Sequence, residues 1–308
     1  MNFRRVISTL FCALVMHVFT APAQAAQLKV VTTMSTFADL TKQIGGEYVS
    51  VSYVAPPRFN PHFIECRPSD VLKVKEADLF IHAGLDLEAW RGPLLDAAGN
   101  PNLFQGGPGE LDLSPGIPLL EVPTQQLSRL MGDIHIYGNP HYWVNPENGR
   151  IIAKEIADKL SQVDPSHAEV YRKNLEVFQR RLDQQITQWK QMASVLQGKE
   201  VIAYHNEWPY LAQFLGIKIE QFLEPKPGIP PSPKQLGFLE EYMKGHQIKA
   251  IIQPTYQPRD SSEALARRTG AQVVILAQNV GELPQAKDYF SMMDYNVQQL
   301  VQAFGGQS

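Results

Sequence analysis

The segment from residue 164 to residue 198 constrains the fold of this 308-residue chain most, because it has the pattern of one long amphipathic helix. Asp164 suits the position that caps a helix N-terminus, Pro165 suits the first turn, and Gly198 suits the end. Between them, apolar residues recur at spacings of three and four: Tyr171, Leu175, Phe178, Leu182, Ile186, Trp189, Ala193 and Leu196. About 33 residues at a rise of 1.5 Å span about 50 Å, which is longer than one small domain. The pattern therefore predicts a rigid strut that runs across two lobes.

Short β-rich runs alternate with helical segments on both sides of this strut. The expected strands are 28–32, 49–54, 79–82, 200–204, 217–222, 248–253 and 273–276. The expected helices are 35–44, 69–75, 149–160, 207–215, 235–244, 261–269 and 288–304. Residues 92–138 are rich in Gly and Pro and are expected to be mostly loop, with one or two short elements that the pattern does not place. Such alternation is typical of parallel sheets covered by helices.

We therefore predict an α/β fold in which two similar lobes with parallel-rich sheets are joined by one long rigid helix. The expected boundaries are an N-terminal lobe at 26–163, the linking helix at 164–198 and a C-terminal lobe at 199–308. If loop tips from both lobes meet, they form the place where α/β proteins build ligand sites.

Residues 1–25 are expected to be a cleaved signal peptide rather than part of the fold. Arginines stand at positions 4 and 5, residues 6–21 form a short apolar stretch, and Ala23-Gln24-Ala25 fits a cleavage site. Cys12 lies inside the apolar stretch, and no cysteine stands at the cleavage point. We therefore expect an exported, soluble periplasmic protein that is not lipid-anchored, the alternative being an uncleaved N-terminal anchor.

Charge and cysteine content narrow the classes of partner. The net charge is −3 and no run of Lys or Arg indicates nucleic-acid binding. Removal of the signal peptide leaves Cys66 as the single cysteine, so no internal disulfide is expected and stability must come from packing. We expect a monomer.

Three histidines stand in aromatic or Pro-rich contexts that suggest a shared site. They are His62 in Asn-Pro-His-Phe, His141 in Asn-Pro-His-Tyr-Trp, and His205 in Tyr-His-Asn-Glu-Trp. They are too distant in sequence for one local motif, so they meet only if the fold brings loops together. Three neutral imidazoles that converge make a divalent-metal site, most naturally for zinc.

Other residues near these histidines are candidates for supporting roles. His135 stands six residues before His141 and is either a fourth ligand or, as we favour, an exposed loop residue. Glu65, Asp39 and Glu207 are candidates to accept the second ring N–H of a ligand histidine, or else are solvated carboxylates and helix caps.

The chain resembles the metal-receptor family of bacterial ABC importers, cluster A-I type, over essentially its whole mature length. The matching segments are 30–40, Asn60-Pro61-His62-Phe63-Ile64-Glu65 with 68–70, 84–90, Pro140-His141-Tyr142-Trp143-Val144-Asn145-Pro146, 204–210 and 289–296. The resemblance implies two α/β lobes, a rigid connecting helix and a metal buried at the lobe interface, held by His62, His141 and His205.

This sequence departs from the family's pattern at the expected acidic ligand. The family often supplies an Asp from the loop after the last strand, and Gln278 occupies that place, while Gln253 replaces a Glu common after the preceding strand. Gln278 is therefore a candidate fourth ligand through a neutral amide oxygen, and water is the alternative. Loss of both acids favours Zn²⁺ over Mn²⁺, with Fe²⁺ also possible. The His-rich loop of many zinc members is absent, and His135 alone remains near its place.

The expected function is that of a periplasmic receptor, not an enzyme, that binds a divalent metal, zinc by preference, and delivers it to the membrane subunit of an ABC permease. The alternative is a zinc-dependent hydrolase that uses the three-histidine site with an open water position and Glu65 or Glu207 as general base. The chain has no His-Glu-x-x-His helix, which counts against that alternative. The Pro-rich segment 224–232 is either a contact for the permease or a rigid connector.

Overall fold

The computed structural model describes residues 27–124, 135–226 and 228–305. The signal peptide expected at 1–25 lies outside these residues. The described chain forms two four-stranded sheets in which every neighbouring pair is parallel. The first sheet has the order β2-β1-β3-β4, with β1 (Leu28–Met34), β2 (Val49–Ala55), β3 (Leu79–His82) and β4 (Glu110–Asp112). The second has the order β6-β5-β7-β8, with β5 (Glu200–Ala203), β6 (Lys218–Phe222), β7 (Ala250–Gln253) and β8 (Gln272–Ile275).

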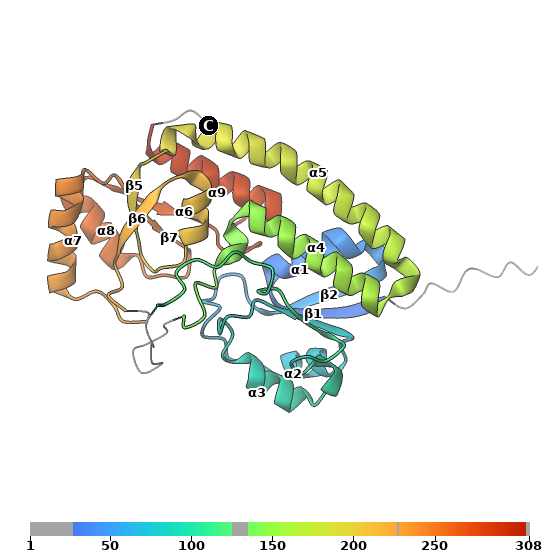
Figure 1. Cartoon of the computed structure of the whole chain (residues 1–308). Coiled ribbons are helices and arrows are strands. Elements are labelled where there is room, and N and C mark those ends of the chain that lie inside the picture. Colours follow the sequence, from blue (N-terminus) through green and yellow to red (C-terminus); the bar gives the residue numbers. More distant parts are fainter. Residues whose placement is uncertain (1–26, 125–134, 227, 306–308) are drawn as a thin grey trace, which may run out of the picture.

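The helices occupy the segments that the sequence pattern predicts, with small differences. They are α1 (Ser35–Gly45), α2 (Pro68–Lys75), α3 (Arg91–Ala98), α4 (Pro146–Val163), α5 (Ala168–Met192), α6 (Pro209–Leu215), α7 (Pro233–His246), α8 (Asp260–Thr269) and α9 (Tyr289–Ala303). The α/β class and the two similar lobes are confirmed, since both sheets repeat one strand order (Figure 1).

Two differences from the predicted elements have local causes. The segment 92–138, expected to be mostly loop, contributes most of α3 and all of β4, which is only three residues long and joins the first sheet beside β3. Helix α4 begins at Pro146 rather than near residue 149, because the Asn145 side chain accepts a hydrogen bond from the backbone N–H of Glu147 at 3.0 Å. A proline is well suited to a first helical turn, where its missing N–H costs nothing.

The predicted strut is one continuous helical segment that arches over both lobes (Figure 1). Helix α5 is extended by 3-10 turns at Pro165–His167 and Ala193–Leu196. Its buried stripe matches the predicted one except at Leu175, which is only partly buried against the core. Asn174 donates to the carbonyl of Ile44 at the end of α1 in the N-terminal lobe, at 2.8 Å. Trp189 donates to Asp294 of α9 in the C-terminal lobe, at 2.6 Å.

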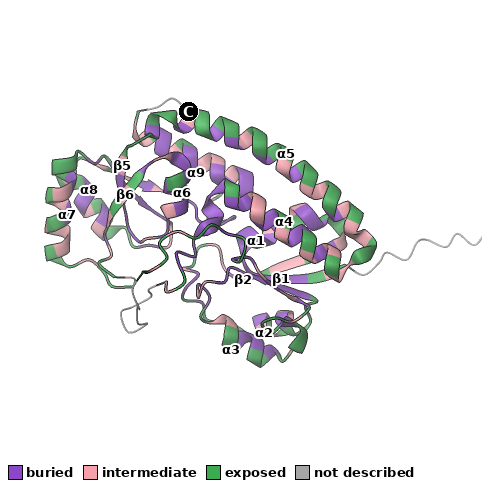
Figure 2. Ribbon diagram, in the orientation of Figure 1, coloured by how far each residue is buried: buried purple, intermediate pink, exposed green. Residues whose placement is uncertain are grey.

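The main hydrophobic core is shared by the two lobes. It contains residues of α1, α4, α5, α6 and α9 and of one face of each sheet. Two smaller cores lie on the other faces, one with α2 and α3 and one with α7 and α8. Figure 2 shows the outer side of α5 exposed and the shared interior buried. Among the described residues, no helix is long and apolar enough to cross a membrane.

Candidate metal centre

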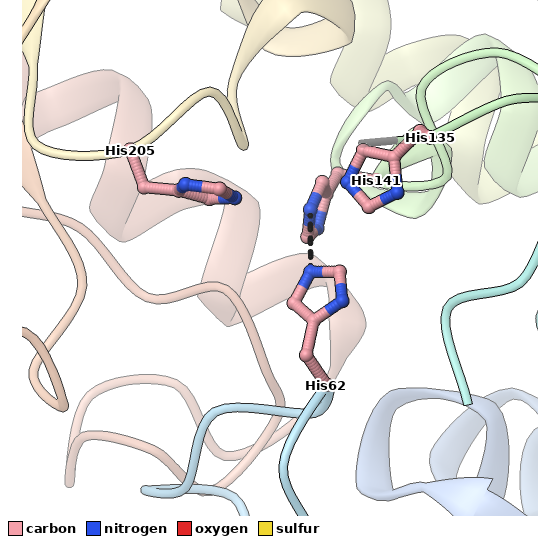
Figure 3. Close-up of side chains that lie close together, drawn as sticks. All are labelled: His62, His135, His141 and His205. Carbon is pink, nitrogen blue, oxygen red and sulfur yellow. Dashed lines mark hydrogen bonds between the residues drawn. The ribbon is translucent and has the colours of Figure 1, made fainter. Parts of the chain in front are cut away.

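The candidate site lies at the carboxyl ends of the parallel strands, where loops from both lobes meet. His62 follows β2, His135 and His141 lie on the chain after β4, and His205 follows β5 directly. Figure 3 shows these four imidazoles from separate loops turned toward one another. Parallel sheets place their binding loops at this edge because all carboxyl ends face the same way. The convergence of His62, His141 and His205 that the sequence predicted is therefore present in the structure.

The two Asn-Pro-His segments use the same local turn. The side-chain oxygen of Asn60 accepts the backbone N–H of His62 at 3.0 Å, and Asn139 does the same for His141 at 3.0 Å. Such Asx turns replace a backbone hydrogen bond and fix the direction of the residue two positions later. The shared sequence Asn-Pro-His thus aims each imidazole into the cleft from its own loop.

The geometry of the cluster suits one small cation. The Nε2 atoms of His62 and His141 lie 3.2 Å apart. Two nitrogens bound tetrahedrally to one zinc at about 2.0–2.1 Å are separated by about 3.3 Å. One ring nitrogen from each of His62, His135, His141 and His205 lies within 4.8 Å of the others. A small contraction of the farther rings would therefore complete a four-nitrogen site.

His135 belongs to this cluster, contrary to the expectation that it is an exposed loop residue. Its ring stacks on that of His62 with centroids 5.0 Å apart, and its Nε2 atom is buried with no hydrogen-bond partner among the described residues. The sequence offered only its closeness to His141 as a signal. Its position depends on the path of the loop after β4, which no local pattern specifies.

Each of two histidines has a side chain behind its ring. His205 Nδ1 lies 2.9 Å from Oε2 of Glu224, so this ring keeps its other nitrogen for the cluster. His141 Nδ1 lies 3.0 Å from the side-chain amide of Gln278. Gln278 therefore lies behind the His141 ring, and Glu224 is a supporting residue that sequence reasoning did not identify.

The three carboxylates proposed from sequence to support the histidines lie in different places. Glu65 is exposed and makes no hydrogen bond in the described structure. Asp39 accepts the backbone N–H of Tyr289 at the start of α9. Glu207 is buried and lies 2.6 Å from the hydroxyl of Tyr256, so it reaches the site indirectly. Gln253 donates to the carbonyl of Gln257 in its own loop.

Burial keeps the imidazoles neutral. It lowers the pKa of His62 and of His141 well below the ordinary value, and the neighbouring histidines add to the effect. Burial, reinforced by His205, lowers the pKa of His135 to about 4. Neutral imidazole is the form that binds a metal ion. The cluster is therefore ready for a cation at neutral pH without first losing protons.

Comparison with known proteins agrees with this geometry. Residues 30–303 match the family model described as "ZnuA: Zinc-uptake complex component A periplasmic". The manganese ABC transporter substrate-binding lipoprotein PsaA of Streptococcus pneumoniae serotype 4 is 27% identical over 288 residues, which cover 90% of this chain and 89% of that protein. The high-affinity zinc uptake system protein ZnuA of Bacillus subtilis is 26% identical over 288 residues, 91% and 89% of the two chains.

Solved structures show the same architecture. A crystal structure of ZnuA superposes with a TM-score of 0.77 at 25% identity, covering 90% of this chain and 99% of that chain. A ZnuA deletion mutant with zinc bound gives a TM-score of 0.74 at 25% identity, covering 92% and 100%. Proteins of this kind are transporter substrate-binding proteins, so the hydrolase alternative gains no support from them. By its match over nearly the whole described length, the chain belongs to the ZnuA family, the divalent-metal receptors of ABC transporters.

Proposed function

We propose that this protein is a Zn²⁺ receptor that binds its cation through His62, His141, His205 and His135 and delivers it to the membrane subunit of an ABC permease. The observation that supports this is the four-imidazole cluster, to which no carboxylate of the described residues contributes a ligand atom. His135 takes the fourth position that Gln278 or water was expected to fill.

The donor set favours zinc over manganese. Relatives of this chain include a manganese lipoprotein and a zinc uptake protein, so family membership leaves the metal open. Imidazole nitrogens suit Zn²⁺ and Fe²⁺, whereas Mn²⁺ prefers carboxylate and carbonyl oxygens. Tetrahedral coordination by four nitrogen ligands is also ordinary for zinc. We therefore expect tight binding of Zn²⁺ and weak binding of Mn²⁺.

Calorimetric titration of the metal-free protein tests the site. His62→Ala, His141→Ala and His205→Ala should each weaken Zn²⁺ binding more than about 100-fold, beyond the about 10–100-fold typical of outer supporting residues. His135→Ala should weaken binding less, because water can replace a ligand at the cluster's least buried ring.

The matched control is His246→Ala, which removes a half-exposed histidine paired with Glu200 at the other end of β5. Its Zn²⁺ affinity should equal that of the unaltered protein. Unchanged affinity in the His62, His141 and His205 variants, or tighter binding of Mn²⁺ than of Zn²⁺, would remove the proposal.

The place of action follows from the same role. A receptor for an importer works outside the cytoplasm, and the apolar segment 6–21 followed by Ala23-Gln24-Ala25 supports export with cleavage. We propose a periplasmic protein without a lipid anchor, although relatives are lipoproteins, because no cysteine stands at the cleavage point. Mass spectrometry of the exported protein should give the unmodified chain beginning near Ala26.

A further inference from the structure

A line of three side chains leads away from the metal site behind His141. Gln278 places its amide 3.0 Å from Nδ1 of His141 and 2.5 Å from the hydroxyl of Tyr256. The same hydroxyl lies 2.6 Å from Oε2 of Glu207. His141 and Gln278 have no exposed surface, and Glu207 is 1% exposed. The line is thus a continuous polar path in the interior of the C-terminal lobe.

Counting hydrogens gives this path a direction. His141 presents Nε2 to the cluster, since that atom faces Nε2 of His62, and a ligand nitrogen carries no hydrogen. Its hydrogen therefore sits on Nδ1 and needs an acceptor, which Gln278 supplies through its amide oxygen. The amide NH₂ then faces Tyr256, whose oxygen accepts, and the single hydroxyl hydrogen goes to Glu207. Exchange of the amide N and O positions is a 180° rotation that leaves the side-chain shape unchanged.

The reverse direction does not suit a ligand. If the Gln278 amide donated to Nδ1, the hydrogen of a neutral His141 would sit on Nε2 and block the metal. The direction from His141 toward Glu207 is the one in which every bond has one hydrogen and Nε2 is free for the cation.

The backbone around the path is held firmly. The carbonyl of Gln278 accepts from the Trp143 indole at 2.8 Å, and its N–H donates to Glu282 at 2.7 Å. Glu282 also accepts the backbone N–H of Thr255 at 2.7 Å, next to Tyr256. One buried carboxylate therefore ties together the two loops that supply Gln278 and Tyr256. This anchoring keeps the Gln278 amide behind the His141 ring.

We propose that Gln278 and Tyr256 are positioning residues which, backed by Glu207, hold His141 with its hydrogen on Nδ1 and its Nε2 free for zinc. This inference rests on the proposed zinc-receptor function. It assigns Gln278 an outer supporting role rather than that of fourth ligand. His205 achieves the same with Glu224 in direct contact, whereas His141 reaches its carboxylate through two intervening groups.

Two variants and one control test the proposal by Zn²⁺ affinity. Gln278→Leu removes the acceptor and Tyr256→Phe removes only the hydroxyl, and each should weaken Zn²⁺ binding about 10–100-fold. Tyr242→Phe is the matched control, because Tyr242 makes an equivalent 2.6 Å bond to Glu200 at the amino end of β5, away from the histidines. Its affinity should not change.

Nitrogen-15 NMR of the zinc-loaded protein supplies a readout that a merely structural role would not move. His141 should show a hydrogen on Nδ1 that is protected from exchange, and this protection should be lost in Gln278→Leu and reduced in Tyr256→Phe.

Three results would overturn the inference. One is unchanged affinity in both variants. Another is a zinc-loaded His141 that carries no Nδ1 hydrogen. The third is a loss of affinity in Gln278→Leu while Tyr256→Phe and the NMR signal stay normal, which would make Gln278 a ligand. Failure of the unaltered protein to bind Zn²⁺ would instead remove the proposed function itself.

Discussion

Neutral, buried histidines make the metal-free protein sensitive to acid. Burial lowers the pKa of His62 and His141, and that of His135 to about 4, while the same groups in an unfolded chain titrate near 6.5. The unfolded chain therefore binds more protons below pH 6.5. The stability that these groups contribute is complete above that pH and is lost as pH falls through their folded pKa values. We predict a fall in the free energy of unfolding between pH 6.5 and pH 4.

Urea unfolding of the metal-free protein at several pH values measures this fall. Carboxylates also titrate in acid, so the comparison of variants decides the cause. His135→Gln should lessen the decline by on the order of 2–3 kcal/mol, because it removes one group with a lowered pKa. His246→Gln, at a half-exposed position, should leave the decline unchanged. Equal declines in the two variants would contradict the prediction.

At the level of single residues, sequence predicted those side chains whose local context fixes their direction. His62 and His141 follow Asn-Pro, which builds an Asx turn, and their convergence with His205 was expected from loops at a strand edge. Glu224 could not be found in this way. It faces His205 because its backbone N–H pairs with the carbonyl of Tyr204, at the end of β6 after an irregular register with β5. Such a pairing between distant segments leaves no local pattern.

The junction between α4 and α5 sets the direction of the strut. Asp164 accepts hydrogen bonds from His167 Nδ1 at 2.7 Å and from the Tyr171 hydroxyl at 2.6 Å. Asp164→Ala would leave the hydroxyl of the buried Tyr171 without this acceptor. We predict a loss of about 1–3 kcal/mol in the free energy of unfolding. Zinc affinity should stay the same, since the junction is at the end of α4 far from His141.

Chemical denaturation and zinc titration of the same variant check both parts. Asp158→Ala is the control, because Asp158 is half-exposed and pairs with Lys154 one turn away on α4. An exposed pair of this kind contributes only about 0.3–0.5 kcal/mol. The role given to the junction fails if Asp164→Ala is no more destabilising than Asp158→Ala, or if it lowers zinc affinity.

Among the elements, length and periodicity decided what sequence could predict. The stripe of the strut repeats over many turns, so its helix and its buried face were predictable. Helix α3 begins Arg-Gly-Pro and is short, which hides its period. Strand β4 is stabilised by pairing with β3 rather than by its own three residues. These elements depend on tertiary contacts that a local pattern does not contain.

On the scale of the whole molecule, the two lobes are coupled by packing as well as by the strut. The main core runs through both lobes, and α5 is hydrogen-bonded to α1 at one end and to α9 at the other. A hinge that opened the lobes would have to separate apolar surface of this shared core, at about 25 cal/mol per Å² exposed. Metal capture should therefore rearrange loops and side chains around the four histidines rather than swing one lobe against the other.

Small-angle X-ray scattering with and without zinc tests this coupling. A compact chain of this length has a radius of gyration of about 19 Å. We predict the same value in both states within error, while saturating zinc at 1,000 times its dissociation constant raises the free energy of unfolding by about 4 kcal/mol. Thermal melting of the same samples verifies that zinc is bound. A contraction of several ångströms on binding, reversed by a chelator, would show that the shared core opens and that the strut acts as a hinge.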